Sequence, residues 1–378
     1  MEIANLRTFP ISNLQSSIFN LQFPILNFQC SFSLGFAASP RYAPSDPLDW
    51  FVCVELFFLR PRECGHDEHA VNGILNIDKP LGLTSRAVVD AVGRLLRELG
   101  FTRRTSPKVG HAGTLDPMAT GVLVVGVGDA TRLIELVQSR PKEYRGTFIF
   151  GCRSDTDDVT GQVVAGDAAR AATIPREELE AALAPFRGRI EQVPPAFSAV
   201  HVGGQRAYQL ARRGEEVELS ARTVEVHRLE VVRFEPPELM LDIECGSGTY
   251  IRSIGRDLGE RLGCGAVMSA LCRTRIGPFE LSQAIPLDQL TADSLAARLQ
   301  PCSIAAAHLP AYVCDAEDMD NLSHGRGIIP RESSWLRKNE PHPESFALVD
   351  HAGTLLAIGG WDRHAPALRA RVNFIGVQ

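Results

Sequence analysis

A chain of 378 residues is long enough for two or three domains, with a sizeable hydrophobic core in the largest. Hydrophobic residues make up 44% of it and charged residues 22%, the composition of a soluble globular protein. The formal net charge of -6 argues against indiscriminate binding to polyanions, although it leaves room for a local basic groove.

The nine cysteines are odd in number and include no C-x-x-C pair. Neither a disulfide framework nor a zinc site fits this spacing, so we interpret them as reduced thiols. The sequence therefore predicts a cytoplasmic protein without a metal site.

Residues 1–70 differ from everything that follows. They hold half of the 18 phenylalanines, and Glu2, Arg7 and Arg41 are the only charged residues before position 45. Their apolar stretches fall short of the about 20 residues that a membrane-spanning helix needs, so we expect no membrane anchor. They also lack the arginines of a transit peptide and a signal-peptide cleavage pattern. We interpret them as an atypical extension, either disordered or the product of a mis-assigned start.

The first regular pattern begins after this extension. Alternating residues at 73–77 predict a buried strand, and apolar residues at helical spacing over 88–99 predict a helix that Gly100 closes. Basic residues then form a stripe, which consists of Arg94, Arg97, Arg103, Arg104 and Lys108. Such a run is ordinarily a solvated face, but its place directly before the next motif keeps a binding role open.

One carboxylate, Asp116, lies between a turn of small residues and Pro117. Pro117 restricts Asp116 toward extended backbone, and an apolar run at 122–125 follows. The acid should therefore stand at the mouth of a buried strand or helix. From this motif alone, a capping turn and a reactive acid are equally good interpretations.

Strand and helix patterns fill the remaining chain. Strands are predicted at 142–150, 223–234 and 239–245, and helices at 175–190, 249–262 and 284–299. An acidic turn at 153–161 lacks the spacing and the terminal glutamate of a calcium loop.

Two further segments have compositions of their own. Residues 195–222 mix arginine with aromatics, which suits a flexible arm that contacts nucleic acid. After a linker near Pro301, the tail at 308–378 has short apolar runs separated by glycines, which predict a small β-rich module.

Five motifs between Gly73 and Leu290 resemble the TruB family of pseudouridine synthases in its bacterial tRNA form. They are Lys79-Pro80-x-Gly82-x-Thr84-Ser85, His111-x-Gly113-x-Leu115-Asp116-Pro117-x-Ala119-Thr120-Gly121, Tyr144-Arg145, the Asp155 to Asp158 turn followed by Gly161, and Gly248-Thr249-Tyr250-Ile251-Arg252. The resemblance implies an α+β pseudouridine synthase fold over 71–300, with a mixed, mainly antiparallel sheet flanked by helices. It also implies an RNA-clamping arm at 195–222 and a PUA-like RNA-binding domain at 308–378.

The resemblance implies a role for each of several residues. Asp116 is expected to be the catalytic aspartate and Arg252 its ionic partner. Tyr144 and Tyr250 are expected to pack against the target base, with Tyr144 counted among the catalytic residues.

Other positions are expected to bind the substrate. By resemblance, His111 helps to hold the opened RNA loop, Lys79 supports the motif from beneath and Leu271 lines the pocket. Arg273 or Arg275 is expected to contact a phosphate. Cys272 departs from the family, because many members have arginine at this position.

Pseudouridine formation breaks the bond between N1 and the ribose and rejoins the ring through C5, so we expect neither a cofactor nor a metal. It needs one carboxylate, held ionised by a fixed cation, in a pocket that excludes water. The stacked base must also flip out of its RNA. The predicted protein is therefore an isomerase, active as a monomer, that converts uridine 55 in the T loop after binding the T stem-loop of tRNA.

Three alternatives fit parts of the sequence. A non-catalytic RNA-binding or RNA-folding protein would not need Asp116. A guide-RNA-dependent synthase shares the aspartate motif, but Ala112, Met118 and Ala119 and the small tail favour the stand-alone form. A glycosidase-like hydrolase would need two carboxylates, for which Asp158 is the one nearby candidate.

Overall fold

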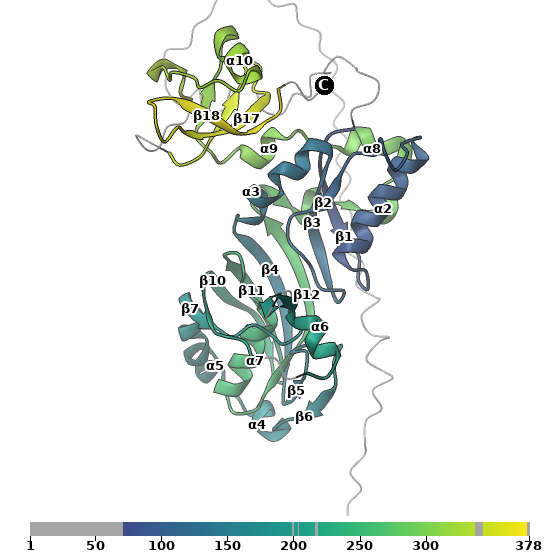
Figure 1. Cartoon of the computed structure of the whole chain (residues 1–378). Coiled ribbons are helices and arrows are strands. Elements are labelled where there is room, and N and C mark those ends of the chain that lie inside the picture. Colours follow the sequence, from purple (N-terminus) through teal and green to yellow (C-terminus); the bar gives the residue numbers. More distant parts are fainter. Residues whose placement is uncertain (1–70, 199, 203, 216–217, 337–342, 376–378) are drawn as a thin grey trace, which may run out of the picture. The chain divides into compact units, whose positions relative to one another are not determined.

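The computed structural model describes residues 71–198, 200–202, 204–215, 218–336 and 343–375, and Figure 1 labels many of their elements. The predictions for residues 1–70 lie outside the described residues. Among the described helices, none is long and apolar enough to cross a membrane.

The larger sheet is mixed and mainly antiparallel, as predicted. Its strands are β1 (Gly73–Lys79), β2 (Val109–His111), β3 (Ala119–Val127), β4 (Lys142–Phe150), β7 (Gly188–Gln192), β10 (Arg222–Glu235), β11 (Glu238–Cys245), β12 (Ala266–Ile276), β13 (Phe279–Glu280) and β14 (Ile285–Pro286). Their order is β14-β1-β3-β12-β4-β11-β10-β7, with β2 beside β3 and β13 beside β12. The parallel pairs are β3 with β12 and β1 with β14.

Burial along the strands follows their place in this sheet. β3, which contains the apolar run at 122–125, is buried at every residue except Thr120, as expected of a strand covered on both faces. β11 alternates between buried and half-buried residues, the pattern of a strand with one face toward the core. The apolar run after Asp116 is therefore a central strand of the sheet.

Most of the helices lie between these strands in the sequence, and two follow the last of them. They are α2 (Ser85–Glu98), α3 (Ile134–Gln138), α4 (Ala168–Ala172), α5 (Arg176–Leu183), α6 (Ala207–Arg212), α7 (Ile251–Arg261), α8 (Ala292–Arg298) and α9 (Ser303–Ala306). The helix predicted at 88–99 is confirmed by α2, where the Thr84 side chain accepts a hydrogen bond from the Ala87 amide as an N-cap. Its buried residues include Val88, Val92 and Leu96, at helical spacing.

Two predicted helices are shorter than expected. The helix predicted over 175–190 ends at Leu183, where a 3₁₀ turn follows, and β7 begins at Gly188. The prediction over 284–299 is wrong in its first half, where residues 285–286 pair with β1 as a strand. Pro286 explains this difference, since proline lacks an amide hydrogen and disfavours a helical conformation at the residue before it.

Two short hairpins lie outside the larger sheet. β5 (Cys152–Ser154) pairs with β6 (Val163–Ala165) and encloses the acidic turn. β8 (His201–Val202) pairs with β9 (Gln205–Arg206) in the segment between β7 and β10. Gln192 pairs with Arg222, so this segment leaves and rejoins the sheet at a single rung.

The C-terminal part of the chain is β-rich, as predicted. It contains β15 (Ala311–Val313), α10 (Ala316–Ser323), β16 (Phe346–Val349), β17 (Leu355–Trp361) and β18 (Leu368–Asn373). The four strands form a second sheet in sequence order, with β15 and β16 parallel and the others antiparallel.

Two helical glycines allow a paired test of packing around α7. A Cβ at Gly255 would lie 2.3 Å from Cδ1 of the fully buried Phe148, whereas a Cβ at Gly93 of α2 would meet nothing closer than 3.9 Å. We expect Gly255→Ala to lower the free energy of unfolding by about 1–3 kcal/mol through overpacking. Gly93→Ala should raise it by about 0.5–1 kcal/mol, because alanine loses less chain entropy in a helix. Chemical denaturation measures both changes, and equal stabilities for the two variants would contradict this account.

Candidate active site

Strand β12 brings distant segments of the chain together at the centre of the larger sheet. Leu271 lies opposite Ala119 on one side, and Arg273 lies opposite Gly121 there and opposite Tyr144 on the other side. Gly121 has φ +96°, and a Cβ there would lie 2.2 Å from the Arg273 carbonyl oxygen, so only glycine fits this crossing. The turn that precedes β3, including Asp116, is thereby placed beside β4 and β12.

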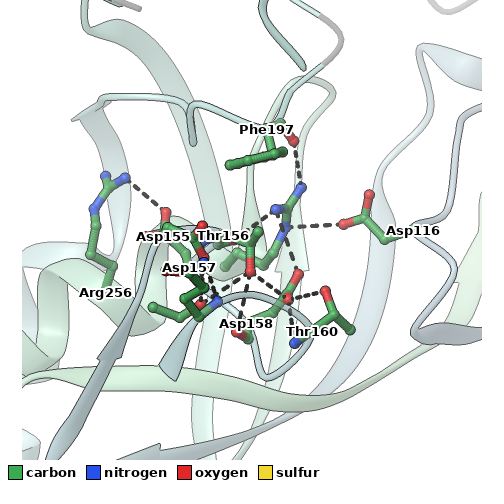
Figure 2. Close-up of polar contacts among 11 residues, drawn as sticks. Asp116, Asp155, Thr156, Asp157, Asp158, Thr160, Phe197 and Arg256 are labelled. Atoms are coloured by element: carbon green, nitrogen blue, oxygen red, sulfur yellow. Dashed lines mark hydrogen bonds and ion pairs between the residues drawn. The ribbon is translucent and has the colours of Figure 1, made fainter. Parts of the chain in front are cut away.

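Asp116 and Arg252 form an ion pair in this region (Figure 2). Arg252 Nε lies 3.0 Å from Asp116 Oδ2. Arg252 is the second residue of α7 and is only 5% exposed, whereas the side chain of Asp116 is 37% exposed. The carboxylate is thus reachable from outside, and its cation is enclosed by protein.

The Arg252 guanidinium has further partners besides Asp116. Nη1 donates to the Thr156 carbonyl at 2.8 Å and lies 3.6 Å from Asp158 Oδ2, while Nη2 donates to the Phe197 carbonyl at 3.1 Å. In Figure 2, Asp116, Phe197 and the turn that carries Thr156 and Asp158 approach this guanidinium from different sides. The orientation of Arg252 is therefore fixed on several sides.

Asp158 is held as firmly as the arginine that it faces. Its Oδ1 accepts hydrogen bonds from the Thr156 hydroxyl and from both the amide and the hydroxyl of Thr160. The turn around it is fastened to β12, since Met268 donates to the Asp157 carbonyl and accepts from the Val159 amide. The acidic turn thus supplies a second, buried carboxylate to the catalytic arginine predicted from the sequence.

The pKa of Asp116 lies above the usual range of an aspartate. Burial is the largest cause, and the negative charge of Asp158 raises the pKa further, while Arg252 and Lys79 oppose the shift. A carboxylate in this state is more basic than a free one and remains next to a permanent cation. Asp116 is therefore suited to act as a base or a nucleophile.

Lys79 lies fully buried under the Asp116 turn. Its Nζ donates to the carbonyls of Pro80 and Leu83 and, at 3.5 Å, to that of Pro117. Burial lowers the pKa of Lys79 to about 8, although the nearby Asp116 opposes this. Its contacts are those of a residue that fixes the turn.

Ser85 fixes the residue directly before Asp116. Its hydroxyl accepts a hydrogen bond from the Leu115 amide at 2.8 Å and donates to the Leu115 carbonyl at 3.1 Å. One buried side chain thus satisfies both backbone groups of Leu115. The sequence motif contained Ser85, but nothing in its spacing indicated this contact.

Tyr144 and Arg273 lie side by side in the sheet. Tyr144 is buried, and burial raises the pKa of its hydroxyl, which the Arg273 guanidinium opposes. Arg273 is 1% exposed, and it donates to the carbonyls of Val122 and Gly113. The expected phosphate contact of Arg273 does not fit this burial, because its guanidinium is turned into the protein.

The other predicted residues are spread around the same region. Leu271 is buried on β12 next to the start of β3. Tyr250 is half-buried and precedes α7 directly. His111 ends β2, and burial, followed by the charges of Arg273 and Arg86, lowers its pKa and so favours the neutral ring.

Sequence reasoning missed the polar contacts that hold these residues in place. Asp158 was noted as part of a turn and as the second carboxylate of a hydrolase, but not as a partner of Arg252, and Ser85 was noted only as part of a motif. Gln192, whose amide is bonded to the Tyr250 backbone, was not noted at all. Within the described residues, no group of three or more histidine, cysteine or acidic side chains is arranged to hold a metal.

Comparison with known proteins gives consistent matches. Residues 101–251 match the family described as "TruB family pseudouridylate synthase (N terminal domain)", and residues 252–307 match "tRNA pseudouridylate synthase B C-terminal domain". A tRNA pseudouridine synthase B from Heliobacterium modesticaldum is 42% identical over 275 residues, which cover 71% of this chain and 87% of the relative. One from Gloeobacter violaceus is 46% identical over 250 residues, covering 63% and 82%.

A solved structure shows the same fold. It is titled "Crystal Structure of a Cbf5-Nop10-Gar1 Complex" and superposes with a TM-score of 0.59 at 28% identity, covering 76% of this chain and 78% of that chain.

The contribution of Asp158 to the basicity of Asp116 can be measured directly. In Asp158→Asn, the negative charge that raises the pKa of Asp116 is gone while Arg252 remains, so this pKa should fall. Titration of the Asp116 carboxyl carbon by NMR, in protein labelled at aspartate Cγ, follows this change. Asp288→Asn, at an exposed position, is the matched control and should leave the pKa of Asp116 unchanged. A rise in this pKa would mean that Asp158 acts by holding Arg252 in place.

Proposed function

The chain belongs to the TruB family of pseudouridylate synthases, and from this premise we propose that it converts uridine 55 in the T loop of tRNA into pseudouridine. The observation that carries the proposal is the accessible carboxylate of Asp116, paired with a buried arginine that a second carboxylate also faces. Relatives at about 40% identity are named tRNA pseudouridine synthase B, which supports tRNA as the substrate.

The reaction is an isomerisation. The bond from C1′ of the ribose to N1 of uracil breaks, the detached ring turns, and a bond from C1′ to C5 forms. The hydrogen on C5 leaves as a proton and N1 gains one, so the formula of the nucleotide is unchanged. Asp116 supplies the nucleophile or base for this exchange, and Arg252 stabilises its charge.

The uracil must leave the stacked T loop to reach Asp116. Flipping a base out of its stack costs a few kcal/mol, which stacking on an aromatic side chain offsets. We assign this role to Tyr144 and Tyr250, with Leu271 lining the pocket and His111 holding the opened loop. The lowered pKa of His111 favours a neutral ring, which suits a contact with an uncharged base.

Contacts with the RNA backbone supply most of the affinity in this proposal. A hollow of about 320 Å³ beside α2 is lined by Arg86, Arg94 and Arg97, with Asp90 as its one acidic residue. Such a basic surface suits phosphates of the T stem, and binding there should weaken as salt rises. The arm at 195–222 and the C-terminal module at 308–378, which we propose to be PUA-like, would add contacts to the same RNA.

Two alternatives are less well supported. A non-catalytic RNA-binding protein would not need a buried arginine between two carboxylates. A guide-RNA-dependent synthase shares the fold, but the relatives with the higher identity are named for tRNA. We therefore propose a stand-alone enzyme that acts as a monomer in the cytoplasm and uses no cofactor.

The direct test uses an unmodified tRNA transcript and maps pseudouridine after incubation. The wild-type protein should modify uridine 55 and no other position, and Asp116→Asn should form no pseudouridine while it binds tRNA with nearly the wild-type Kd. Asparagine keeps the size of the side chain but removes its charge and basicity. Normal turnover by this variant would refute the role of Asp116, and modification elsewhere in the tRNA would refute the assigned uridine.

Arg252→Lys tests whether the reaction needs the guanidinium or only a positive charge. A lysine cannot reach Asp116, the Thr156 carbonyl and the Phe197 carbonyl together, so we expect the single-turnover rate to fall about 100-fold or more. Arg176→Lys, in an exposed pair with Glu180, is the control and should keep the wild-type rate. A wild-type rate in Arg252→Lys would show that charge alone suffices.

A further inference from the structure

Gln192 makes an unusual pair of hydrogen bonds to one residue. It is the last residue of β7 and is 2% exposed. Its Oε1 accepts from the Tyr250 amide at 2.8 Å, and its Nε2 donates to the Tyr250 carbonyl at 3.1 Å. The side chain of Gln192 thus bonds the backbone of Tyr250 at two points, as a neighbouring β-strand would.

This contact lies where α7 begins. Tyr250 has extended backbone and is the N-cap residue of α7, but its own side chain does not cap the helix. A helix start without a side-chain cap depends on other groups to fix the entry of the chain. Gln192 supplies that constraint two residues before Arg252.

The residues after Gln192 hold the first turns of the same helix. The Val193 carbonyl accepts hydrogen bonds from the Ser253 hydroxyl at 3.1 Å and from Arg256 Nη2 at 2.8 Å. The Phe197 carbonyl accepts from Arg252 Nη2, the contact drawn in Figure 2. Five hydrogen bonds therefore join the segment at 192–197 to Tyr250 and to the first turns of α7.

We propose that Gln192 is a positioning residue for pseudouridine formation. By holding the backbone of Tyr250, it sets the position of the Tyr250 ring and, through the start of α7, the direction of the Arg252 guanidinium toward Asp116. This inference rests on the proposed function. It adds a residue that touches neither the substrate nor the reacting carboxylate.

The chain after Gln192 also connects this site to the arm. The arm segment leaves the sheet at the rung formed by Gln192 and Arg222. Gln192 therefore fixes both the base of the arm and the start of the helix that carries Arg252. A change at Gln192 should act on the chemical step more than on RNA binding, because the hollow beside α2, to which we assign the phosphates, contains no residue of this segment.

Gln192→Glu separates a positioning role from a merely structural one. The introduced carboxylate still accepts from the Tyr250 amide, but its second oxygen faces the Tyr250 carbonyl and repels it. Protonation of the carboxyl restores a donor there, so the defect should shrink as pH falls. The rate of the wild-type protein also changes with pH through Asp116, and the ratio of variant to wild-type rate removes this common effect.

The experiment measures single-turnover release of tritium from tRNA labelled at C5 of uridine, between pH 5.5 and 8.5, with the Kd for tRNA measured alongside. At pH 8 we expect Gln192→Glu to be slower by about 10- to 100-fold, the scale of a small misplacement in an active site. Its Kd should stay near that of the wild type, and the rate ratio should rise toward one at low pH. Gln289→Glu, which adds the same charge at an exposed position, should keep a ratio of one throughout.

Other outcomes would overturn the inference. A rate ratio of one at every pH, or a reduced ratio that does not change with pH, would exclude positioning through this pair of bonds. Gln192→Leu removes both bonds, and a wild-type rate in this variant would exclude it independently. An inactive wild-type protein would refute the proposed function itself, whereas active wild type with a flat ratio refutes the role of Gln192 alone.

Discussion

The structure depends most on the burial of one guanidinium. Removing a charge from water costs several kcal/mol unless charged and polar partners replace the lost hydration. Arg252 obtains these partners from three segments of the chain, which supply Asp116, the Phe197 carbonyl, and Asp158 with the Thr156 carbonyl. The convergence of these segments on the start of α7 is therefore required by the arginine as much as by any substrate.

Regular patterns and short motifs made much of the fold and part of the candidate active site predictable from the sequence. Helical spacing identified α2, and the apolar run after Asp116 identified β3 as buried chain. From its own residues, however, Asp116 was equally a cap and a reactive acid, and only the order of the later motifs favoured the second. Ser85 and Gln192 could not be recognised, because bonds from a side chain to a distant backbone leave no periodic signal.

Arg273 shows a second limit of sequence reasoning. Alternation along a strand places Arg273 and Arg275 on one face, and both then look like candidates for a phosphate contact. In the structure, the pairing of β12 with β4 shifts register between these two residues. Arg273 is enclosed under the Asp116 turn, while the Arg275 side chain is 42% exposed and pairs with Glu143. A single bulge thus separates two neighbouring arginines into different environments.

The arm leaves and rejoins the sheet at a single pair of residues, so its sequence can be replaced without changing the sheet. Gln192 and Arg222 close the excursion, and among the described residues of the arm none after Phe197 is hydrogen-bonded to α7. The entropy cost of closing a loop grows only with the logarithm of its length, so the stretch after Phe197 can be lengthened, shortened or replaced at little cost in stability. The sequence and length of this stretch can therefore change to bind different RNAs, while the residues that carry out the reaction stay the same.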